Sequence, residues 1–168
     1  MTVGLRADAG GTFGELLLGG SPVVRFDSGG LTTTTSGQDY YNQANILGVV
    51  SQSGGVPTGA IIERGSNANG NYTRFADGTQ VCQITRVDGS FAISGALVGG
   101  FASTAIPWTF PAAFSAIPGV SSNPAGGTAF GTMHGSVNVA TTDYHYTAVT
   151  SQGAASRTVT LLAIGRWF

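Results

Sequence analysis

Residues 69–86 read NGNYTRFADGTQVCQITR, and this stretch decides the fold class. Two alternating segments flank the dipeptide Asp77-Gly78, and Asp-Gly at such a point is a strong signal for a β-hairpin. A type I′ turn at this dipeptide requires positive φ at both central residues. Because side chains alternate along a strand, Cys82 and Ile84 share one apolar face of the second segment. The stretch therefore predicts an antiparallel hairpin with one buried face.

The composition of the whole chain favours many short strands joined by turns. Glycine accounts for 27 of 168 residues, yet 42% of the residues are hydrophobic, which is too many for a disordered chain. A second Asp-Gly pair, Asp88-Gly89, predicts another turn. Turn signals every 8–12 residues and about seven strands within residues 58–168 are typical of an antiparallel β-sandwich. We therefore expect an all-β protein with a sandwich head.

The charge pattern excludes several classes of partner. Only 9% of the residues are charged, the net charge is −1, and every basic residue is arginine. No nucleic-acid partner is expected from such a chain. Residues 89–142 carry no charge, but prolines interrupt any apolar span of about 20 residues, so no membrane insertion is expected. The N-terminus lacks a signal-peptide pattern, and the single cysteine, Cys82, is compatible with synthesis in a reducing cytosol.

The sequence predicts two parts. Residues 1–57 form an N-terminal segment and connector, in which glycine pairs punctuate short apolar runs, and residues 58–168 form the head. The first part has too little apolar surface to fold without partner copies or a partner protein. Within the connector, Ser36 is a possible cap for a short helix ending at Asn45, and an extended segment is the alternative.

The end of the chain, SRTVTLLAIGRWF at residues 156–168, predicts a strand that is apolar on both faces. Leu161 and Ala163 occupy one face, and Leu162 and Ile164 the other. A strand of this kind is covered on both sides. It fits either a central strand of the sandwich or an oligomer interface.

Two segments carry a family resemblance. GAIIERGSNA at residues 59–68, followed by NGNYTRFADGTQVC at residues 69–82, resembles the start of the C-terminal head of phage and prophage tail-fibre proteins. AGGTFGELLLGGSPVVRFDSGG at residues 9–30 is similar to the segment that often precedes such heads. Related fibres occur on the heads of phage-like gene transfer agents.

A second resemblance concerns the head itself. FPAAFSAIPGV at residues 110–120 and RTVTLLAIGRW at residues 157–167 look like parts of the H-type lectin fold. That family is a small β-sandwich that forms trimers and binds sugars.

These resemblances imply a fibre or spike protein on the surface of a virion or phage-like particle. The N-terminal segment would attach to other virion proteins, and the head, as a homotrimer, would bind a host-surface polysaccharide. We expect no enzyme activity and no cofactor. Two alternatives remain: a structural collar or capsid-decoration protein, and a capsule depolymerase.

A sugar site needs an aromatic face and a few fixed polar groups. The densest such cluster is Asp-Tyr-His-Tyr at residues 143–146. Side chains alternate along this predicted strand, so Tyr144 and Tyr146 share one face and Asp143 and His145 the other. The candidate sugar-binding residues are Asp143, Tyr144, His145, Tyr146, Trp108 and Arg157. The competing interpretation makes Trp108 and Trp167 core or interface residues.

The sequence supports a metal site or a nucleophilic catalytic site less than it supports a sugar site. His134, Asp143 and His145 are possible ligands, but a full metal site needs three or four, which a threefold axis would have to supply. We therefore assign no metal site. Cys82 is interpreted as a buried small hydrophobe rather than a nucleophile, because no catalytic signature surrounds it.

A depolymerase would use two carboxylates at a defined separation. The candidates are Glu63, Asp77, Asp88 and Asp143. Glu63 differs in character from its apolar strand neighbours, and Arg64 and Arg74 are its possible ion-pair partners. Asp77 and Asp88 already have a structural explanation in Asp-Gly turns, so no catalytic residue is assigned.

Overall fold

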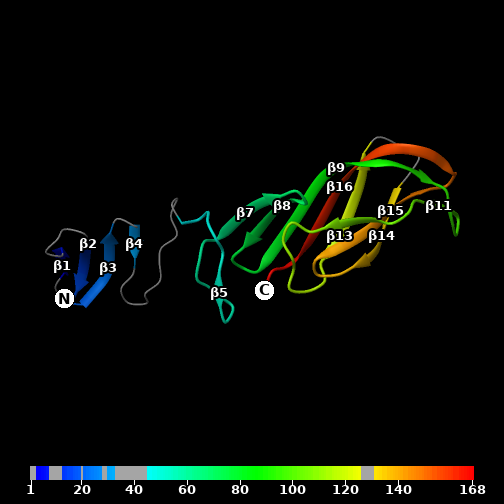
Figure 1. Cartoon of the computed structure of the whole chain (residues 1–168). Coiled ribbons are helices and arrows are strands. Elements are labelled where there is room, and N and C mark those ends of the chain that lie inside the picture. Colours follow the sequence, from blue (N-terminus) through cyan, green and yellow to red (C-terminus); the bar gives the residue numbers. More distant parts are fainter. Residues whose placement is uncertain (1–2, 8–12, 20, 28–29, 33–44, 126–130) are drawn as a thin grey trace. The chain divides into compact units, whose positions relative to one another are not determined.

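The computed structural model describes residues 3–7, 13–19, 21–27, 30–32, 45–125 and 131–168. These residues form an all-β protein built from antiparallel sheets, as predicted, and no helix occurs among them. The chain divides into two compact units, Met1–Ile46 and Leu47–Phe168, which are described separately (Figure 1). Most of the connector segment for which a short helix or an extended strand was considered, residues 36–44, lies outside the described residues. No helix long and apolar enough to span a membrane is found in the described parts of the chain.

The first unit is a four-stranded antiparallel meander in the order β1-β2-β3-β4. Its strands are β1 (Val3–Ala7), β2 (Phe13–Leu18), β3 (Ser21–Asp27) and β4 (Gly30–Thr32). The short strands expected between glycine pairs are therefore present. Arg6 Nη2 contacts Glu15 Oε2 at 2.6 Å across the β1–β2 pair, and Glu15 is buried.

The second unit contains two five-stranded sheets and a small hairpin (Figure 1). The hairpin pairs β5 (Gln52–Ser53) with β6 (Val56–Pro57). One sheet has the order β13-β16-β9-β8-β7, formed by β7 (Ile62–Asn67), β8 (Gly70–Phe75), β9 (Thr79–Ile93), β13 (Gly119–Ala125) and β16 (Gln152–Arg166). The other has the order β10-β11-β15-β12 with β14 on the other side of β15, formed by β10 (Gly95–Leu97), β11 (Gly100–Ala102), β12 (Ile106–Thr109), β14 (Gly131–Val137) and β15 (Thr141–Ala148).

The core of this unit lies between the two sheets. The β9–β16 sheet contributes buried aliphatic residues and Cys82, and the β15 sheet with the loop after β12 contributes aromatic rings. The main members are Cys82, Ile93, Trp108, Phe110, Phe114, Tyr144, Tyr146, Val159, Leu161 and Ala163. Trp108, Phe110 and Phe114 meet edge to face in sequence, with centroids 5.0 and 5.2 Å apart, a favoured aromatic geometry.

The predicted hairpin at Asp77-Gly78 is present, but its turn type differs from the expectation. Gly78 has a φ of 94°, whereas no non-glycine residue in the described chain has a positive φ, so the turn is not type I′. The Gly78 N–H donates to the Phe75 carbonyl at 3.0 Å. This fits the three-residue hairpin loop in which a type I turn precedes a left-handed glycine. Asp77 contributes through its side chain, because its Oδ1 accepts the Thr79 N–H at 2.8 Å.

The predicted turn at Asp88-Gly89 is wrong. Both residues lie inside β9, a strand of 15 residues that continues to Ile93. Its partner β16 is equally long, and the register between them shifts near Arg157, which pairs with Asp88. The long pairing with β16 overrides the local preference of Asp-Gly for a turn. As a result, Gly89 has no positive φ and Asp88 is buried.

The strand apolar on both faces, β16, is a central strand of its sheet, between β13 and β9. Leu161 and Ala163 are fully buried, while Ile164 on the other face remains 47% exposed. The structure thus supports the central-strand interpretation for the inner face of β16, and Ile164 on its opposite face is partly exposed in the described part of the second unit.

The second unit begins at Leu47, before residue 58, the expected start of the head, because the end of the connector contacts the sandwich. Gly48 N–H donates to the Ile62 carbonyl and Ala60 N–H to the Val49 carbonyl, both at 3.0 Å. Val50 is buried, and its N–H donates to Glu63 Oε2 at 3.1 Å. The segment from residue 47 is therefore fastened to the sandwich. The expected attachment role of residues 1–57 stays a prediction.

Candidate functional site

The Asp-Tyr-His-Tyr cluster lies on β15 and is split between the two faces of its sheet. Tyr144 and Tyr146 point into the sandwich and are fully buried, whereas Asp143 and His145 alternate with them and are partly exposed. The alternation expected from the sequence is therefore correct. In this conformation neither tyrosine offers a ring face to a sugar, because stacking requires an exposed ring.

The two tyrosine hydroxyls meet the carboxylate of Asp88. Tyr144 donates to Asp88 Oδ2 at 2.5 Å and Tyr146 donates to the same atom at 3.0 Å. Arg86 completes the group, since its Nε lies 2.8 Å from Asp88 Oδ1 and its Nη2 donates to the Tyr144 oxygen at 2.8 Å. Burying a carboxylate is costly unless it is paired and hydrogen-bonded, and Arg86 and the two tyrosines supply those partners.

This environment holds both phenols in the protonated state. Burial is the main reason that the pKa of Tyr144 is raised, and the hydrogen bond to Asp88 raises it further. Burial also raises the pKa of Tyr146, again with a contribution from the Asp88 charge. Both side chains therefore act as hydrogen-bond donors to Asp88 and not as acids.

Trp108 and Arg157, the two more distant candidates, are also buried. Trp108 Nε1–H donates to the Asn69 carbonyl at 2.9 Å, which ties β12 to the β7–β8 turn. Arg157 Nη1 donates to the carbonyls of Phe91 and Ala155 at 2.8 and 3.0 Å. These Arg157 contacts stabilise the place where the β9–β16 register shifts. Sugar binding itself stays a prediction, and of the six candidates only Asp143 and His145 reach the surface.

The three possible metal ligands have separate roles. His145 Nδ1 contacts the Ser103 carbonyl oxygen at 2.9 Å, and the Asp143 carboxylate accepts the Ser136 N–H. His134 turns inward, where its Nδ1 lies 3.3 Å from Thr142 Oγ1, and its buried Nε2 has no hydrogen-bond partner among the residues that the structure describes. Burial lowers the pKa of His134. Within the described ranges, no three His, Cys, Asp or Glu side chains are grouped closely enough to hold a metal ion.

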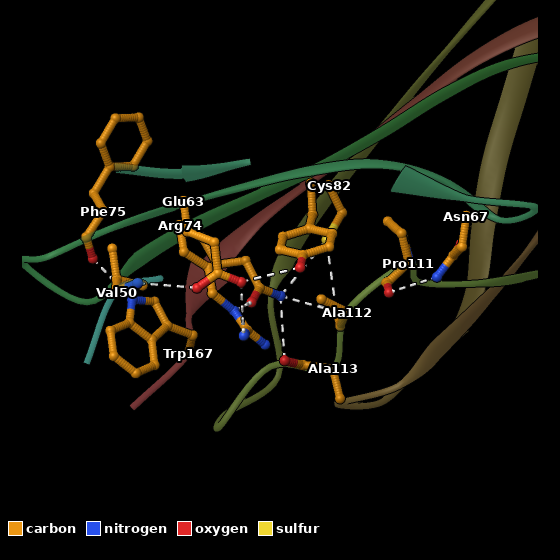
Figure 2. A network of polar contacts seen from close by, with 12 residues as sticks. Val50, Glu63, Asn67, Arg74, Phe75, Cys82, Pro111, Ala112, Ala113 and Trp167 are labelled. Atoms are coloured by element: carbon orange, nitrogen blue, oxygen red, sulfur yellow. Dashed lines mark hydrogen bonds and ion pairs between the residues drawn. The ribbon is translucent and has the colours of Figure 1, made fainter. Parts of the chain in front are cut away.

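Glu63 belongs to a polar network at the start of the head (Figure 2). Its Oε1 accepts the Tyr72 hydroxyl at 3.0 Å and lies 3.6 Å from Arg74 Nη1, while its Oε2 accepts the Val50 N–H. The hydrogen bond to Glu63 is the main reason that the pKa of Tyr72 is raised. Glu63 therefore has a structural task, which is to fasten the connector to β8.

The network continues through Gln80 to the loop after β12. Arg74 Nε donates to Gln80 Oε1 at 2.8 Å, and the buried Gln80 amide donates to the carbonyls of Ala112 and Ala113 at 2.8 and 3.2 Å. Figure 2 shows Arg74 beside Trp167, whose Nε1–H donates to the Phe75 carbonyl at 2.8 Å. The segment FPAAF is thus held against β9 by side-chain amide hydrogen bonds.

Cys82 lies beside this network, fully buried, as expected for a small hydrophobe. Burial raises the pKa of the thiol, which disfavours the reactive thiolate. Its Sγ lies 3.6 Å from the Ala112 carbonyl oxygen.

The four carboxylates of the second unit therefore all have structural partners. Asp77 caps its turn, Asp143 accepts from Ser136, Asp88 binds two tyrosines and Arg86, and Glu63 binds the connector. Sequence reasoning missed the role of Asp88 and the contacts of Gln80 and Val50 in the polar network. It did identify Arg74, beside Arg64, as a partner for Glu63, and the structure selects Arg74, whose Nη1 lies 3.6 Å from Glu63 Oε1.

Comparison with known proteins adds little. No family model and no curated protein matches the chain. Among solved structures, the R1 pyocin fibre of P. aeruginosa, a fragment comprising C-terminal residues 323–701, is similar with a TM-score of 0.43 and 14% identity. The alignment covers 96% of this chain and 53% of that fragment, so the chain spans about half its length. A similarity this low assigns neither a family nor a function.

Proposed function

We propose that this chain is a fibre or spike protein of a phage or phage-like particle and that it attaches the particle to the host surface. The observation that carries the proposal is the segment at residues 59–82, which resembles the start of fibre heads. This segment forms β7, β8 and the beginning of β9, which begin one sheet of the sandwich. The preceding strand-rich unit is the part that would join other virion proteins.

The described residues support a binding role for the head better than a catalytic one. The carboxylates that a depolymerase would use have internal partners, and Thr, Ser, Asn and Gln are common among the exposed strand positions. Copies of the head displayed together, as in the homotrimer that the resemblance implies, make weak sites effective.

Host-surface polysaccharide is the ligand that the resemblance implies. Asp143 and His145 are partly exposed on the outward side of β15, where each also has one internal contact, Asp143 with the Ser136 N–H and His145 with the Ser103 carbonyl oxygen. Their neighbours on β14 and β12, Met133 and Pro107, are exposed. A sugar bound there would be held by hydrogen bonds to these polar side chains, since the aromatic members of the predicted cluster are in the core.

The test is binding of the purified full chain to encapsulated and acapsular strains of one bacterium, with soluble capsule as competitor. The proposal predicts binding that capsule removes. Undetectable binding to every strain tested favours the structural alternative, a collar or capsid-decoration protein. New reducing ends or unsaturated sugars after incubation favour the depolymerase alternative.

A further inference from the structure

The β13-β16-β9-β8-β7 sheet has one side that points away from the sandwich core, and this side carries two arginines. Cys82 on β9 is buried in the core, so its neighbour Val81 and the Val81 partner Ile164 point outward. Arg64 lies in the same register row as these two residues, and Arg166 lies two residues after Ile164. Both arginine side chains are exposed. We define the arginine side as Arg64, Thr73, Phe75, Val81, Ile164 and Arg166.

The other arginines of the second unit are used inside the protein. Arg74 and Arg86 form ion pairs with carboxylates at 3.6 and 2.8 Å, and Arg157 is buried and donates to backbone carbonyls. By contrast, none of the ion pairs in the described part of the chain involves Arg64 or Arg166. These two positive charges are therefore left for a ligand.

The strands that carry the two arginines place no negative charge on the same side. Glu63 and Asp88 are the acidic residues in the sequences of β7, β8, β9 and β16. Glu63 accepts from Val50 and Tyr72 on the inward side, and Asp88 is buried in the core. The arginine side is thus positively charged, although the whole chain has a net charge of −1.

The guanidinium of Arg166 is held in place by its neighbours. A Cβ at Gly78 would lie 2.4 Å from Arg166 Nη2, so the guanidinium packs against the bare backbone of this glycine. It also lies over the Phe168 ring, with Cζ 5.3 Å from the ring centroid. A cation that is already positioned loses less conformational entropy when it binds an anion.

Apolar groups and an aromatic ring lie on the same side as the two arginines. Val81 pairs with Ile164, which is 47% exposed. Phe75 is partly exposed, and Figure 2 shows its ring directed away from the Glu63–Arg74 network. Sugar sites combine an apolar or aromatic surface with a few fixed polar groups, and the arginine side offers both.

The spacing of the two arginines favours a polymer. Strands β7 and β16 are three strand spacings apart, about 14 Å, and Arg166 lies one register row beyond Arg64, about 7 Å, so the two Cα atoms are about 16 Å apart. The planar fork of each guanidinium matches an anionic group such as a carboxylate or phosphate. A ligand that contacts both arginines therefore needs acidic groups at more than one place along its length.

We propose that the arginine side binds an anionic polysaccharide and that Arg64 and Arg166 each contact an acidic group of the polymer. Charge complementarity carries the proposal, and two arginines are too few for the basic patch that nucleic acids require. The inference rests on the proposed function for the expectation that the ligand is a host-surface polysaccharide. It adds the charge of that polysaccharide and a surface on the other sheet from Asp143 and His145.

The experiment measures binding of the full chain to dextran sulfate and to neutral dextran of the same length, because the two polymers share a backbone and differ in their anionic groups. Calorimetry at low salt is expected to show binding of dextran sulfate alone, weakening as salt is added. Arg64→Gln and Arg166→Gln are each expected to raise the dissociation constant about tenfold, because each removes a charge-assisted hydrogen bond. Thermal unfolding of both variants checks that they are folded.

Two further variants separate a local contact from the total charge. Val98→Glu, at the fully exposed turn between β10 and β11, changes the net charge by the same amount as Arg64→Gln and is expected to bind like the wild type. Asp77→Asn is expected to bind dextran sulfate more tightly. The Arg166 charge reaches Asp77, where it adds to the Thr79 hydrogen bonds that lower the pKa of this carboxyl, so the variant removes a negative charge close to Arg166.

Equal binding of the two polymers, no binding of dextran sulfate, or folded arginine variants that bind like the wild type would overturn the inference. A loss in Val98→Glu as large as that in Arg64→Gln would also overturn it, because binding would then follow the total charge. Cell binding by the same samples separates the two claims. A chain that binds cells equally well without the two arginines contradicts only the inference, whereas one that binds dextran sulfate through them but binds no cells contradicts only the attachment function.

Discussion

The hydroxyl of Tyr144 donates a hydrogen bond of 2.5 Å to the carboxylate of Asp88, joining the two sheets of the sandwich through its core. Tyr144 belongs to β15 and Asp88 to β9, and 56 residues of chain separate them. Asp88 was expected in a turn and Tyr144 at a sugar site, but both are buried in the core, where they bind each other.

The Asp88→Asn variant is expected to lose about 3 kcal/mol of unfolding free energy, because it removes the buried charge that Arg86 and two tyrosine hydroxyls require. Urea unfolding followed by tyrosine and tryptophan fluorescence measures the loss. The exposed turn residue Asp77 supplies a matched control, since Asp77→Asn keeps an oxygen that accepts the Thr79 N–H. An equal, small loss for both variants would contradict the role given to Asp88.

Gly78→Val is expected to destabilise the protein by about 2 kcal/mol or more, because a β-branched residue resists the φ of 94°. A Cβ there would also lie 2.4 Å from the Arg166 guanidinium. Gly89→Val is the matched control in the other Asp-Gly pair, where the backbone is extended and a Cβ meets nothing within 4 Å. Thermal unfolding of the two variants should differ clearly, and equal melting temperatures would refute this assignment of the two glycines.

These two glycines also show which features of the fold local sequence patterns can predict. Local alternation and turn chemistry predicted the Asp77-Gly78 hairpin, the buried face at Cys82 and the all-β class. The same rule failed at Asp88-Gly89, because the pairing of β9 with β16 depends on residues far along the chain.

The predicted sugar cluster shows the same limit. The alternation of residues 143–146 was correct, but which face of β15 meets the other sheet is decided by tertiary packing. The aromatic side chains were therefore assigned to the surface when they belong to the core.

His134→Gln is expected to change how stability depends on pH. The pKa of His134 is lowered in the folded protein by burial, so the neutral form is favoured there and protonation favours the unfolded chain. The stability that neutral His134 provides is complete above the ordinary pKa of 6.5 and is lost as the pH falls through the lowered folded-state pKa.

The measurement is the unfolding free energy of wild type and His134→Gln between pH 8 and pH 5. The wild type should lose stability relative to the variant as the pH falls. The partly exposed His145 gives the control His145→Gln. A wild-type curve parallel to that of His134→Gln would rule out the buried imidazole as a source of the pH dependence.

Glu63→Ala is expected to release the connector while the sandwich stays folded. Glu63 accepts hydrogen bonds from Val50 N–H and the Tyr72 hydroxyl, so its removal leaves both donors without this partner. Amide hydrogen exchange at residues 48–50 should become about tenfold faster, in line with the loss of about 1.4 kcal/mol of local stability. Arg64→Ala, at the exposed neighbouring position, should leave exchange unchanged, and unchanged exchange in Glu63→Ala would contradict the fastening role.

The most direct test of the attachment function is competition for the host surface. Bacterial cells are incubated with the purified full chain, then exposed to the particle that carries it, and the free particles are counted. The proposal predicts that adsorption falls as the protein concentration rises and recovers when capsule is supplied in solution. Particle adsorption that stays unchanged at saturating protein would contradict it.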